Sequence, residues 1–433
     1  MSAMSEHIGR TEPAGGAAGF TTVQDRGMLE WARRRPADGF VIGLALRLRG
    51  PRPTPERLAA LVTARLPLVP ALAEHLDGPV REESWLRAGD FDAARHVHRH
   101  VHRPDHRLDH DRAGDHRVQA ALETMANQPV PENLPRWGLW LLDTEHRDTG
   151  HRDTGHHDTY WLVYRVHHAA QDGAAAGHTV RRLLDARTPA PAPRAPHRPD
   201  RPDSAHRPGP GRWAVAPAHA PAPTDGRLLA TAEVPADALR AVSRASGASL
   251  NDVYLAALAG ALRAWLPPAG RDRPVPVRVP FSVRLRSERQ DRGNRFGYAR
   301  VLLPVDEPHA AGRLSRVAEQ TRSWPRDRNR RILDALPDAM LTPHVSAFLS
   351  PGDALATATL LQIPGPLALD GSPVTGGVAL PPLVGGYLFS TVLFLHGARA
   401  TASFTAESRH EHVRDLPRLW EKELTALTDA TRA

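Results

Sequence analysis

The sequence predicts an α/β protein made of two domains. Runs of aromatic and large aliphatic residues, which are typical of strands, alternate with amphipathic helices in both halves of the chain. The 433 residues exceed the usual size of one domain. Eleven prolines fall between Pro189 and Pro223, and because proline lacks a backbone N–H, this stretch is neither helix nor inner strand. We therefore predict a first domain over 20–187, a proline-rich linker over 188–226 and a second domain over 227–433.

Strands and one helix are predicted in the first half. Val41–Leu48 is a strand, and Pro55–Leu66 is an amphipathic helix that Thr54 caps. Trp137–Leu142 and Tyr160–Val166 are rich in aromatic and aliphatic residues and are predicted as strands. Between these two strands the sequence His-Arg-Asp-Thr-Gly occurs twice in tandem, over 146–155, and is interpreted as a lengthened hairpin loop.

The second half contains the clearest helix of the sequence, Ser249–Trp265. Ser249 and Asp252 have the spacing of a capping box, an apolar stripe follows, and a Pro-Pro pair ends the helix. Strands are predicted at four further segments: Val275–Val283, Tyr298–Leu303, Leu388–Leu395 and Ala400–Thr405.

Composition excludes several classes of chemistry. The chain has no cysteine, which removes thiol nucleophiles, thiolate metal sites and disulfides. Basic residues number 56 against 48 acidic ones, but all except Lys422 are arginines interspersed with acids, so we expect no nucleic-acid partner. Residues 1–20 lack the apolar core of a signal peptide, and no apolar run reaches about 18 residues, so we expect a cytoplasmic protein with at most peripheral membrane contact.

One short stretch carries most of the chemical information: His167-His168-Ala-Ala-Gln-Asp172-Gly173, which follows a strand and precedes a helix. A histidine at a strand end lies where open α/β sheets bind ligands, and its ordinary pKa suits general-base work near neutral pH. Asp172 can order the turn, and Gly173 lets a backbone N–H approach a substrate closely at a helix N-terminus. The alternative is a chance pair in a chain with 24 histidines.

This element resembles the active-site motif of the CoA-dependent acyltransferase superfamily, which includes the condensation domains of peptide synthetases. Within it, the chain looks most like the wax ester synthase/diacylglycerol acyltransferase family. Further segments similar to that family follow in the same order along residues 27–425: Ala64–Pro70, Trp85, Asp90–Asp92, His96-Val97, Ser249–Arg263, Val279–Arg284, Gly293-Asn294, Leu303-Pro304 and Pro364–Pro366.

The resemblance implies two pseudo-symmetric α/β domains, each a mixed sheet with flanking helices, and an active-site tunnel at their interface. It implies an acyl-CoA donor, a small hydroxyl or amine acceptor and no separate cofactor. The resemblance places the catalytic residues in the motif, at His167, His168, Asp172 and Gly173. Of these it makes His168 the general base.

The resemblance also suggests roles for the neighbours of the base. It makes Asp172 structural through a pair with Arg284 across the interface, and Gly173 N–H the oxyanion donor. Arg284 and Asn251 are expected among the substrate-binding residues, although Asn251 can equally serve only as a helix N-terminal hydrogen bond.

Three segments depart from the family pattern: Pro135–Trp137, Leu361–Ile363 and Phe394–Gly397. These departures favour a specialised enzyme, such as one of small-molecule (secondary metabolite) biosynthesis, over bulk storage-lipid synthesis. An alternative keeps the fold but takes the acyl group from an acyl carrier protein, as condensation domains do, to form an ester or amide. A non-catalytic interaction module and a nucleic-acid binder are the other classes considered.

Four histidines, at positions 96, 98, 100 and 102, alternate with other residues and would face one side of a strand. Such a row can bind zinc or nickel, but no carboxylate or cysteine completes a known ligand spacing, so we expect no metal site.

Overall fold

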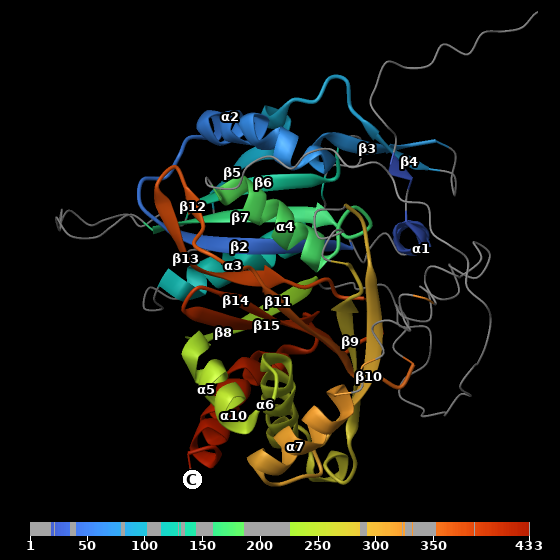
Figure 1. Cartoon of the computed structure of the whole chain (residues 1–433), viewed down its shortest axis with the longest axis vertical. Helices are drawn as coiled ribbons and strands as arrows, with labels where there is room; N and C mark the ends of the chain where they lie inside the picture. The colour runs from blue at the N-terminus through green and yellow to red at the C-terminus, as the bar shows by residue number, and fades with distance from the viewer. Residues whose placement is uncertain are drawn as a thin grey trace, which may run out of the picture.

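The computed structural model shows a mixed α/β molecule with two six-stranded sheets (Figure 1). The predicted α/β class is confirmed. Besides residues 19–20 and the single residues Val130, Trp324 and Arg331, the structure describes the segments 22–34, 40–78, 83–101, 114–128, 135–143, 159–185, 226–285, 292–322, 352–384 and 386–432. The tandem repeat over 146–155 and nearly all of the proline-rich linker lie outside the described residues, and the domain boundaries stay a prediction.

The first sheet has the strand order β12-β13-β2-β7-β6-β5. Its strands are β2 (Val41–Arg49), β5 (Val97–Val101), β6 (Trp137–Asp143), β7 (Thr159–His167), β12 (Ala368–Leu369) and β13 (Ser372–Leu380). The three strands predicted in the first half are β2, β6 and β7. In the antiparallel β2–β7 pair Val41 lies opposite His167, so the end of β7 reaches the point where β2 begins.

Three helices pack against this sheet. α2 (Pro55–Arg65) and α4 (Gly173–Leu184) share one apolar core on one face, and α3 (Gly114–Ala126) belongs to a second core on the other face. Thr54 caps α2 as predicted, because its side chain accepts a hydrogen bond from Arg57 N at 3.2 Å.

The second sheet has the strand order β10-β9-β11-β14-β15-β8. Its strands are β8 (Arg227–Pro235), β9 (Val275–Ser282), β10 (Phe296–Leu303), β11 (Ala356–Gln362), β14 (Phe389–His396) and β15 (Arg399–Glu407). The helices α5 (Ala236–Ser246), α6 (Leu250–Trp265), α7 (Ala310–Thr321) and α10 (Leu416–Ala430) lie together on one face of this sheet (Figure 1).

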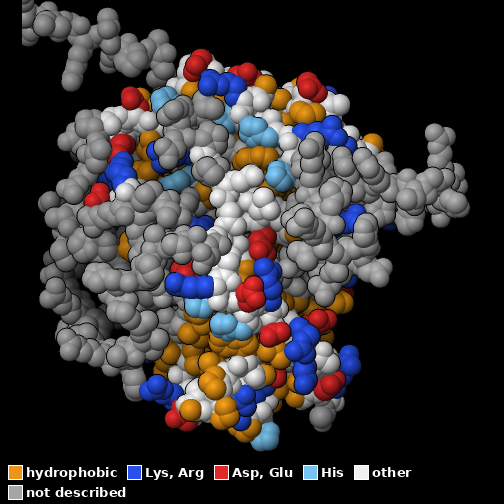
Figure 2. All heavy atoms as spheres, turned by 180° about the vertical axis from the view of Figure 1, so that it is seen from behind, with side chains coloured by type: hydrophobic (Ala, Val, Ile, Leu, Met, Phe, Trp, Pro, Cys, Tyr) orange, Lys and Arg blue, Asp and Glu red, His pale blue; other side chains and the backbone are white. Residues whose placement is uncertain are grey.

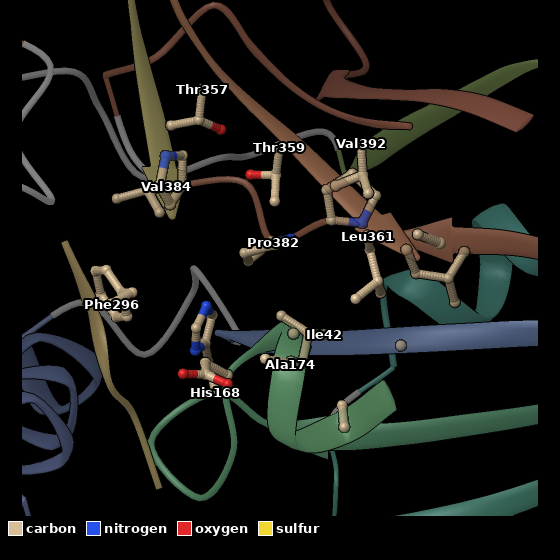
Figure 3. A pocket seen from close by; sticks show the side chains of 18 of the residues that line it. Ile42, His168, Ala174, Phe296, Thr357, Thr359, Leu361, Pro382, Val384 and Val392 are labelled. Atoms are coloured by element: carbon tan, nitrogen blue, oxygen red, sulfur yellow. The ribbon is translucent and has the colours of Figure 1, made fainter. Parts of the chain in front are cut away.

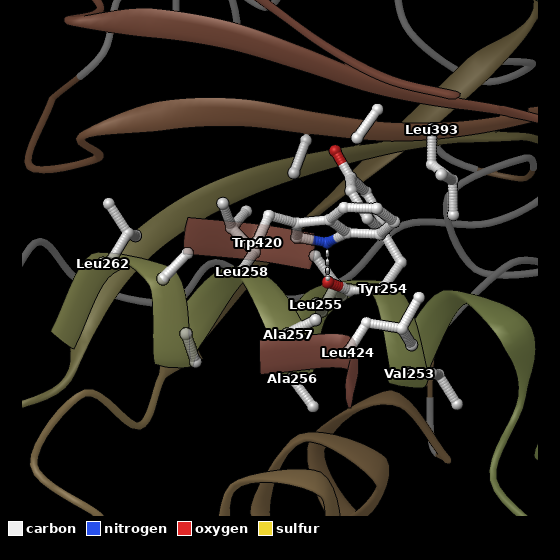
Figure 4. Close-up of a cluster of buried hydrophobic side chains, with 14 of the residues drawn as sticks. Val253, Tyr254, Leu255, Ala256, Ala257, Leu258, Leu262, Leu393, Trp420 and Leu424 are labelled. Atoms are coloured by element: carbon white, nitrogen blue, oxygen red, sulfur yellow. Dashed lines mark hydrogen bonds between the residues drawn. The ribbon is translucent and has the colours of Figure 1, made fainter. Parts of the chain in front are cut away.

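The core beneath these helices centres on α6. Ser249 and Asp252 form the predicted capping box, with Ser249 N donating to Asp252 Oδ2 at 2.8 Å. Apolar residues on nearly every side of α6 are buried, and Trp420 of α10 packs against the helix with its indole N–H donating to Tyr254 O (Figure 4). A helix that is apolar all round is expected when it is enclosed by a sheet and by other helices.

The C-terminal half contributes two strands to the first sheet. β13 pairs antiparallel with β2, with Gly377 opposite Leu46, and β12 pairs with β13 at the edge. β13 also lies against β14 and β15 of the second sheet. Backbone pairing within the first sheet therefore joins the two halves of the chain, and the contacts of β13 with β14 and β15 join the two sheets.

A small sheet and a helix complete the N-terminal part. β1 (Gly19–Phe20) pairs with β4 (Ser84–Arg87), which pairs with β3 (Glu74–Asp77), and α1 (Val23–Arg34) follows β1. Short 3-10 turns cover Leu66–Leu68, Pro70–Ala73, Ala93–His96, Pro268–Gly270 and Glu411–Asp415.

Charged side chains of both signs lie next to one another on the face shown in Figure 2. Ion pairs among the described residues include Arg47 with Glu233 at 2.9 Å and Arg414 with Glu123 at 2.9 Å. Among the described residues, no helix has the length and apolar composition that a membrane crossing requires. The cytoplasmic location stays a prediction.

Candidate active site

A largely apolar cavity of about 190 Å³ is lined by residues of both sheets (Figure 3). β2 contributes Ile42, β10 contributes Phe296, and β11 contributes Thr357 and Thr359. His168 lies at the wall opposite the two threonines, with its imidazole directed toward the space between them (Figure 3). Such a site, mostly apolar with a few convergent polar groups, is typical of small-molecule binding.

His168 is held at this wall by its backbone and by two rings. It follows the last residue of β7, and its N–H donates to Phe40 O at 2.8 Å. The imidazole stacks on the Phe40 ring, with centroids 5.1 Å apart, and the Phe296 ring lies 6.4 Å away. Burial lowers the pKa of His168 below its ordinary value, an effect that Asp172 and Asn294 oppose. The imidazole is therefore neutral near pH 7, as a general base must be.

Asn294 determines which nitrogen of His168 carries the proton. His168 Nδ1 lies 3.1 Å from Asn294 Oδ1, and Asn294 Nδ2 lies 2.8 Å from His168 O and 3.2 Å from Ala169 O. Because Nδ2 faces carbonyl acceptors, Oδ1 must face the ring, and an amide oxygen only accepts. Nδ1 is therefore the protonated nitrogen, and Nε2 keeps the lone pair that a base needs.

Asp172 joins α4 to the second half of the chain. Its Oδ1 caps α4 by accepting from Ala175 N at 2.9 Å, and its Oδ2 forms an ion pair with Arg284 and accepts from Arg295 N at 2.9 Å. Arg284 also donates to Gly293 O at 2.6 Å. The Asp172 and Arg284 side chains of this ion pair are 6% and 2% exposed, and the pair connects the start of α4 to the Gly293 turn. Of the two, Asp172 but not Arg284 is among the residues that line the cavity.

The other predicted residues have different positions. Gly173 is the first residue of α4 and lines the cavity, and the first N–H groups of a helix have no partner within it. His167 is buried, and its Nδ1 accepts from Ala169 N at 3.2 Å. Burial lowers the pKa of His167 to about 3, so it stays neutral. Neither His167 nor Asn251 at the start of α6 is among the residues that line the cavity.

Two residues near the base have no role in the sequence-based account. Asn294 belongs to Gly293-Asn294, one of the segments that resemble the family, and this resemblance is the sequence signal that could have identified it. Asp25, in the first turn of α1, accepts from Asn294 Nδ2 at 2.7 Å, although 269 positions separate the two residues. Only the folded chain brings them together.

The expectation that the histidine row faces one side is wrong for its first two members. His96 ends a 3-10 turn and stacks on Trp137, with centroids 4.5 Å apart, in the core beneath α2. His98 lies in β5 and packs against Trp140, which belongs to the core on the other face. Regular alternation starts only at Val97, after the turn. His102 lies outside the described residues, and the described part of the chain contains no group of three metal-ligating side chains.

Comparisons with known proteins find sequence relatives and solved structures that are named acyltransferases or condensation domains. No family model matches the chain. Over 200 residues the chain is 34% identical to a Mycobacterium tuberculosis protein provisionally named a diacylglycerol O-acyltransferase. The aligned region covers 42% of this chain and 41% of that protein. A second M. tuberculosis protein, also provisionally named a diacylglycerol O-acyltransferase, is 32% identical over 133 residues, covering 30% of this chain and 26% of that protein. The chain thus spans less than half the length of the curated relatives it matches.

Solved structures match almost the whole chain at low sequence identity. The wax ester synthase/diacylglycerol acyltransferase from Marinobacter aquaeolei VT8 superposes with a TM-score of 0.61 at 16% identity, covering 94% of this chain and 98% of that one. The starter condensation domain of rhizomide synthetase, in complex with C8-CoA and Leu-SNAC, gives 0.62 at 15% identity, covering 96% and 95%. The first condensation domain of the calcium-dependent antibiotic synthetase, in complex with a substrate analogue, gives 0.62 at 15%, covering 97% of each chain. The chain is therefore similar in part of its sequence to proteins named diacylglycerol O-acyltransferases, and it shares its fold with a wax ester synthase/diacylglycerol acyltransferase and with condensation domains.

Proposed function

We propose that the protein transfers an acyl group from an acyl thioester to a hydroxyl or amine acceptor, with His168 as general base. The observation that carries this proposal is the His168–Asn294 contact of 3.1 Å at the wall of the cavity. It leaves a neutral imidazole whose Nε2 lone pair is available to an acceptor proton. The similarity to proteins named acyltransferases supports the same reaction class.

The step balances without a cofactor or an enzyme-bound acyl group. The acceptor oxygen or nitrogen attacks the thioester carbonyl while His168 Nε2 takes its proton, and a new C–O or C–N bond forms. The tetrahedral oxyanion develops beside the N-terminus of α4, where Gly173 N–H can donate to it and the helix dipole favours negative charge. The C–S bond then breaks, and the thiolate receives the proton from the imidazolium.

The cavity lining suggests the chemistry of the substrates. Its walls are mostly apolar, which suits an acyl chain, and the polar exceptions include the Thr357 and Thr359 hydroxyls opposite His168 (Figure 3). Leu361, from one of the segments that depart from the family pattern, also lines the cavity. We therefore propose a specialised, small-molecule acceptor in place of diacylglycerol or a long-chain alcohol.

A second candidate differs only in the donor. The condensation domains and the wax ester synthase fit the chain with TM-scores of 0.62 and 0.61, so the fold is equally compatible with both donors considered from the sequence, an acyl carrier protein and acyl-CoA. Transfer from an acyl carrier protein but not from the matching acyl-CoA would favour this candidate.

A mass-spectrometric screen tests the proposal. Purified protein and the His168→Ala variant are incubated with pools of acyl-CoAs and of alcohols and amines. We expect acylated products with the wild type alone. Equal product formation by the two proteins would overturn the proposal, and rapid acylation of diacylglycerol would overturn the specialised acceptor.

A further inference from the structure

We infer that Asp25 is a positioning residue for His168, acting through the amide of Asn294. Its carboxylate fixes the amide so that His168 keeps its proton on Nδ1 and presents an unprotonated Nε2 to the cavity. The catalytic consequence of this inference rests on the proposed function, whereas the protonation pattern does not.

The amide of Asn294 can be satisfied in one orientation only. Its Nδ2 faces three acceptors, Asp25 Oδ1 at 2.7 Å, His168 O at 2.8 Å and Ala169 O at 3.2 Å. A rotated amide would bring Oδ1 against all three oxygens and would turn the donor toward His168 Nδ1. Of the three acceptors, the carboxylate makes the shortest contact, and charge-assisted hydrogen bonds are about twice as strong as neutral ones.

Asp25 is itself held in one position. Thr22 N donates to its Oδ2 at 2.8 Å and Asn294 N to its Oδ1 at 2.8 Å, while Asp25 N donates to Thr22 Oγ1 at 3.1 Å. The residue is 1% exposed, and burial raises the pKa of its carboxyl to about 6. At neutral pH it is therefore mostly ionised, and a carboxylate can only accept.

Gly293 makes the approach of Asp25 possible. Its φ is +80°, in the region that favours glycine, and a Cβ at this position would lie 2.8 Å from Asp25 Oδ2. The Gly293-Asn294 pair therefore acts as one unit. Gly293 leaves room for the Asp25 carboxylate, and Asn294 donates hydrogen bonds to it.

The packing of α1 against the segment around Asn294 does not require a buried carboxylate at position 25. Gln24 already joins the helix to the same segment, with Nε2 donating to Phe296 O at 2.6 Å and Oε1 accepting from Phe296 N at 3.1 Å. A buried charge carries a desolvation cost that a neutral side chain avoids. Asp25 therefore does something that Gln24 does not, which is to fix the Asn294 amide.

The first measurement needs no substrate. In wild-type protein with ¹⁵N-labelled histidine, two-bond ¹H–¹⁵N correlations at pH 7.5 should show His168 with a protonated Nδ1 and an unprotonated Nε2. In Asp25→Asn the new amide must turn a donor toward Thr22 N–H or toward Asn294, so the Nε2-protonated form should appear. Asn294→Ala should give the same change.

The second measurement separates positioning from docking. We expect kcat of Asp25→Asn to fall about tenfold or more, with KM changed less than about threefold, because a wrong tautomer removes the base without removing the binding site. The matched control is Gln24→Ala, which breaks two hydrogen bonds between the same helix and the same segment. It should lower the unfolding midpoint but leave the His168 spectrum and kcat close to wild type.

Each outcome has a defined meaning. Protonation of His168 at Nε2 in the wild type would overturn the inference even if the variants fail to fold. An unchanged tautomer in Asp25→Asn, or equal losses of kcat in Asp25→Asn and Gln24→Ala, would do the same. Full activity of His168→Ala would instead overturn the proposed function and leave the tautomer result intact.

Discussion

At the scale of single residues, the proposed chemistry depends on one imidazole and the groups that set its protonation. His168 has a lowered pKa because it is buried, yet Asn294 and Asp172 favour its charged form and limit that effect. Burial, with the charges of Arg136 and His168 adding to its effect, lowers the pKa of the neighbouring His167 to about 3. Two adjacent histidines thus have different environments, and only His168 meets the cavity.

Gly173→Ala tests the space beside the proposed oxyanion donor. No atom lies within 4 Å of a Cβ added at Gly173, so the fold should tolerate the methyl group and the unfolding midpoint should stay within a few degrees. The methyl should crowd the thioester oxygen and lower kcat/KM about tenfold or more. Gly177→Ala, one turn further along α4, is the control, and an unchanged kcat/KM in Gly173→Ala would contradict the assignment.

The buried His167 should make the protein sensitive to acid. The pKa of His167 is about 3 in the folded state and about 6.5 in the unfolded state. Between these pH values only the unfolded state binds the extra proton, so the free energy of unfolding decreases as the pH is lowered. From pH 7 to pH 5 the wild type should lose about 2 kcal/mol relative to His167→Gln. Urea unfolding at both pH values measures this difference, and a pH-independent difference would contradict the burial of a neutral ring.

At the scale of elements, locally encoded features are those that the sequence predicts. The caps of α2 and α6 are recognised because Thr54 and the Ser249–Asp252 box lie beside the helices they begin. The sequence does not predict β13, because its pairing with β2 joins segments more than 300 positions apart and Gly376-Gly377 weakens the strand pattern. Among the described residues, the two-residue strand β12 pairs only with β13. The Asp25–Asn294 contact was missed for the same reason as β13, since nothing near Asp25 in the sequence indicates its partner.

Asp172 should be worth more than an ordinary helix cap. Asp172→Ala removes the cap of α4, which costs about 1 kcal/mol, and leaves Arg284 buried without its ion-pair partner, which costs about 3–5 kcal/mol. Asp172→Asn should recover only the cap. The control is Thr54→Ala in α2, which should lose about 1 kcal/mol in urea unfolding. Equal losses in Asp172→Ala and Thr54→Ala would show that the ion pair contributes little.

At the scale of the whole molecule, β13 connects the two sheets, because it pairs with β2 in the first sheet and packs against β14 and β15 of the second. It belongs by sequence to the second half, yet it pairs with β2, and the cavity lies where residues of both sheets meet. The fold class and the His168 motif could be predicted from sequence, because the strands and the motif are local. The shape of the cavity could not, because its walls come from segments spread over more than 300 positions.

Gly377→Ala tests how strongly β13 joins the halves. A Cβ at Gly377 would lie 2.5 Å from Ala45 O and 3.0 Å from the Phe394 ring, so β13 must move away from β2. We expect a loss of about 1–3 kcal/mol in one cooperative transition. At Gly376 the same methyl meets the flexible end of Arg47, so Gly376→Ala should cost less. Equal effects of the two substitutions would contradict the tight β2–β13 contact.

A comparison of rates tests whether His168 is the base for acyl transfer. With an acyl thioester and an acceptor identified by the screen, kcat/KM of His168→Ala should fall about 10²–10⁴-fold. His178→Gln, which removes another histidine from α4 that does not line the cavity, should stay within about threefold of wild type. Retention of wild-type kcat/KM by a folded His168→Ala protein would contradict the account.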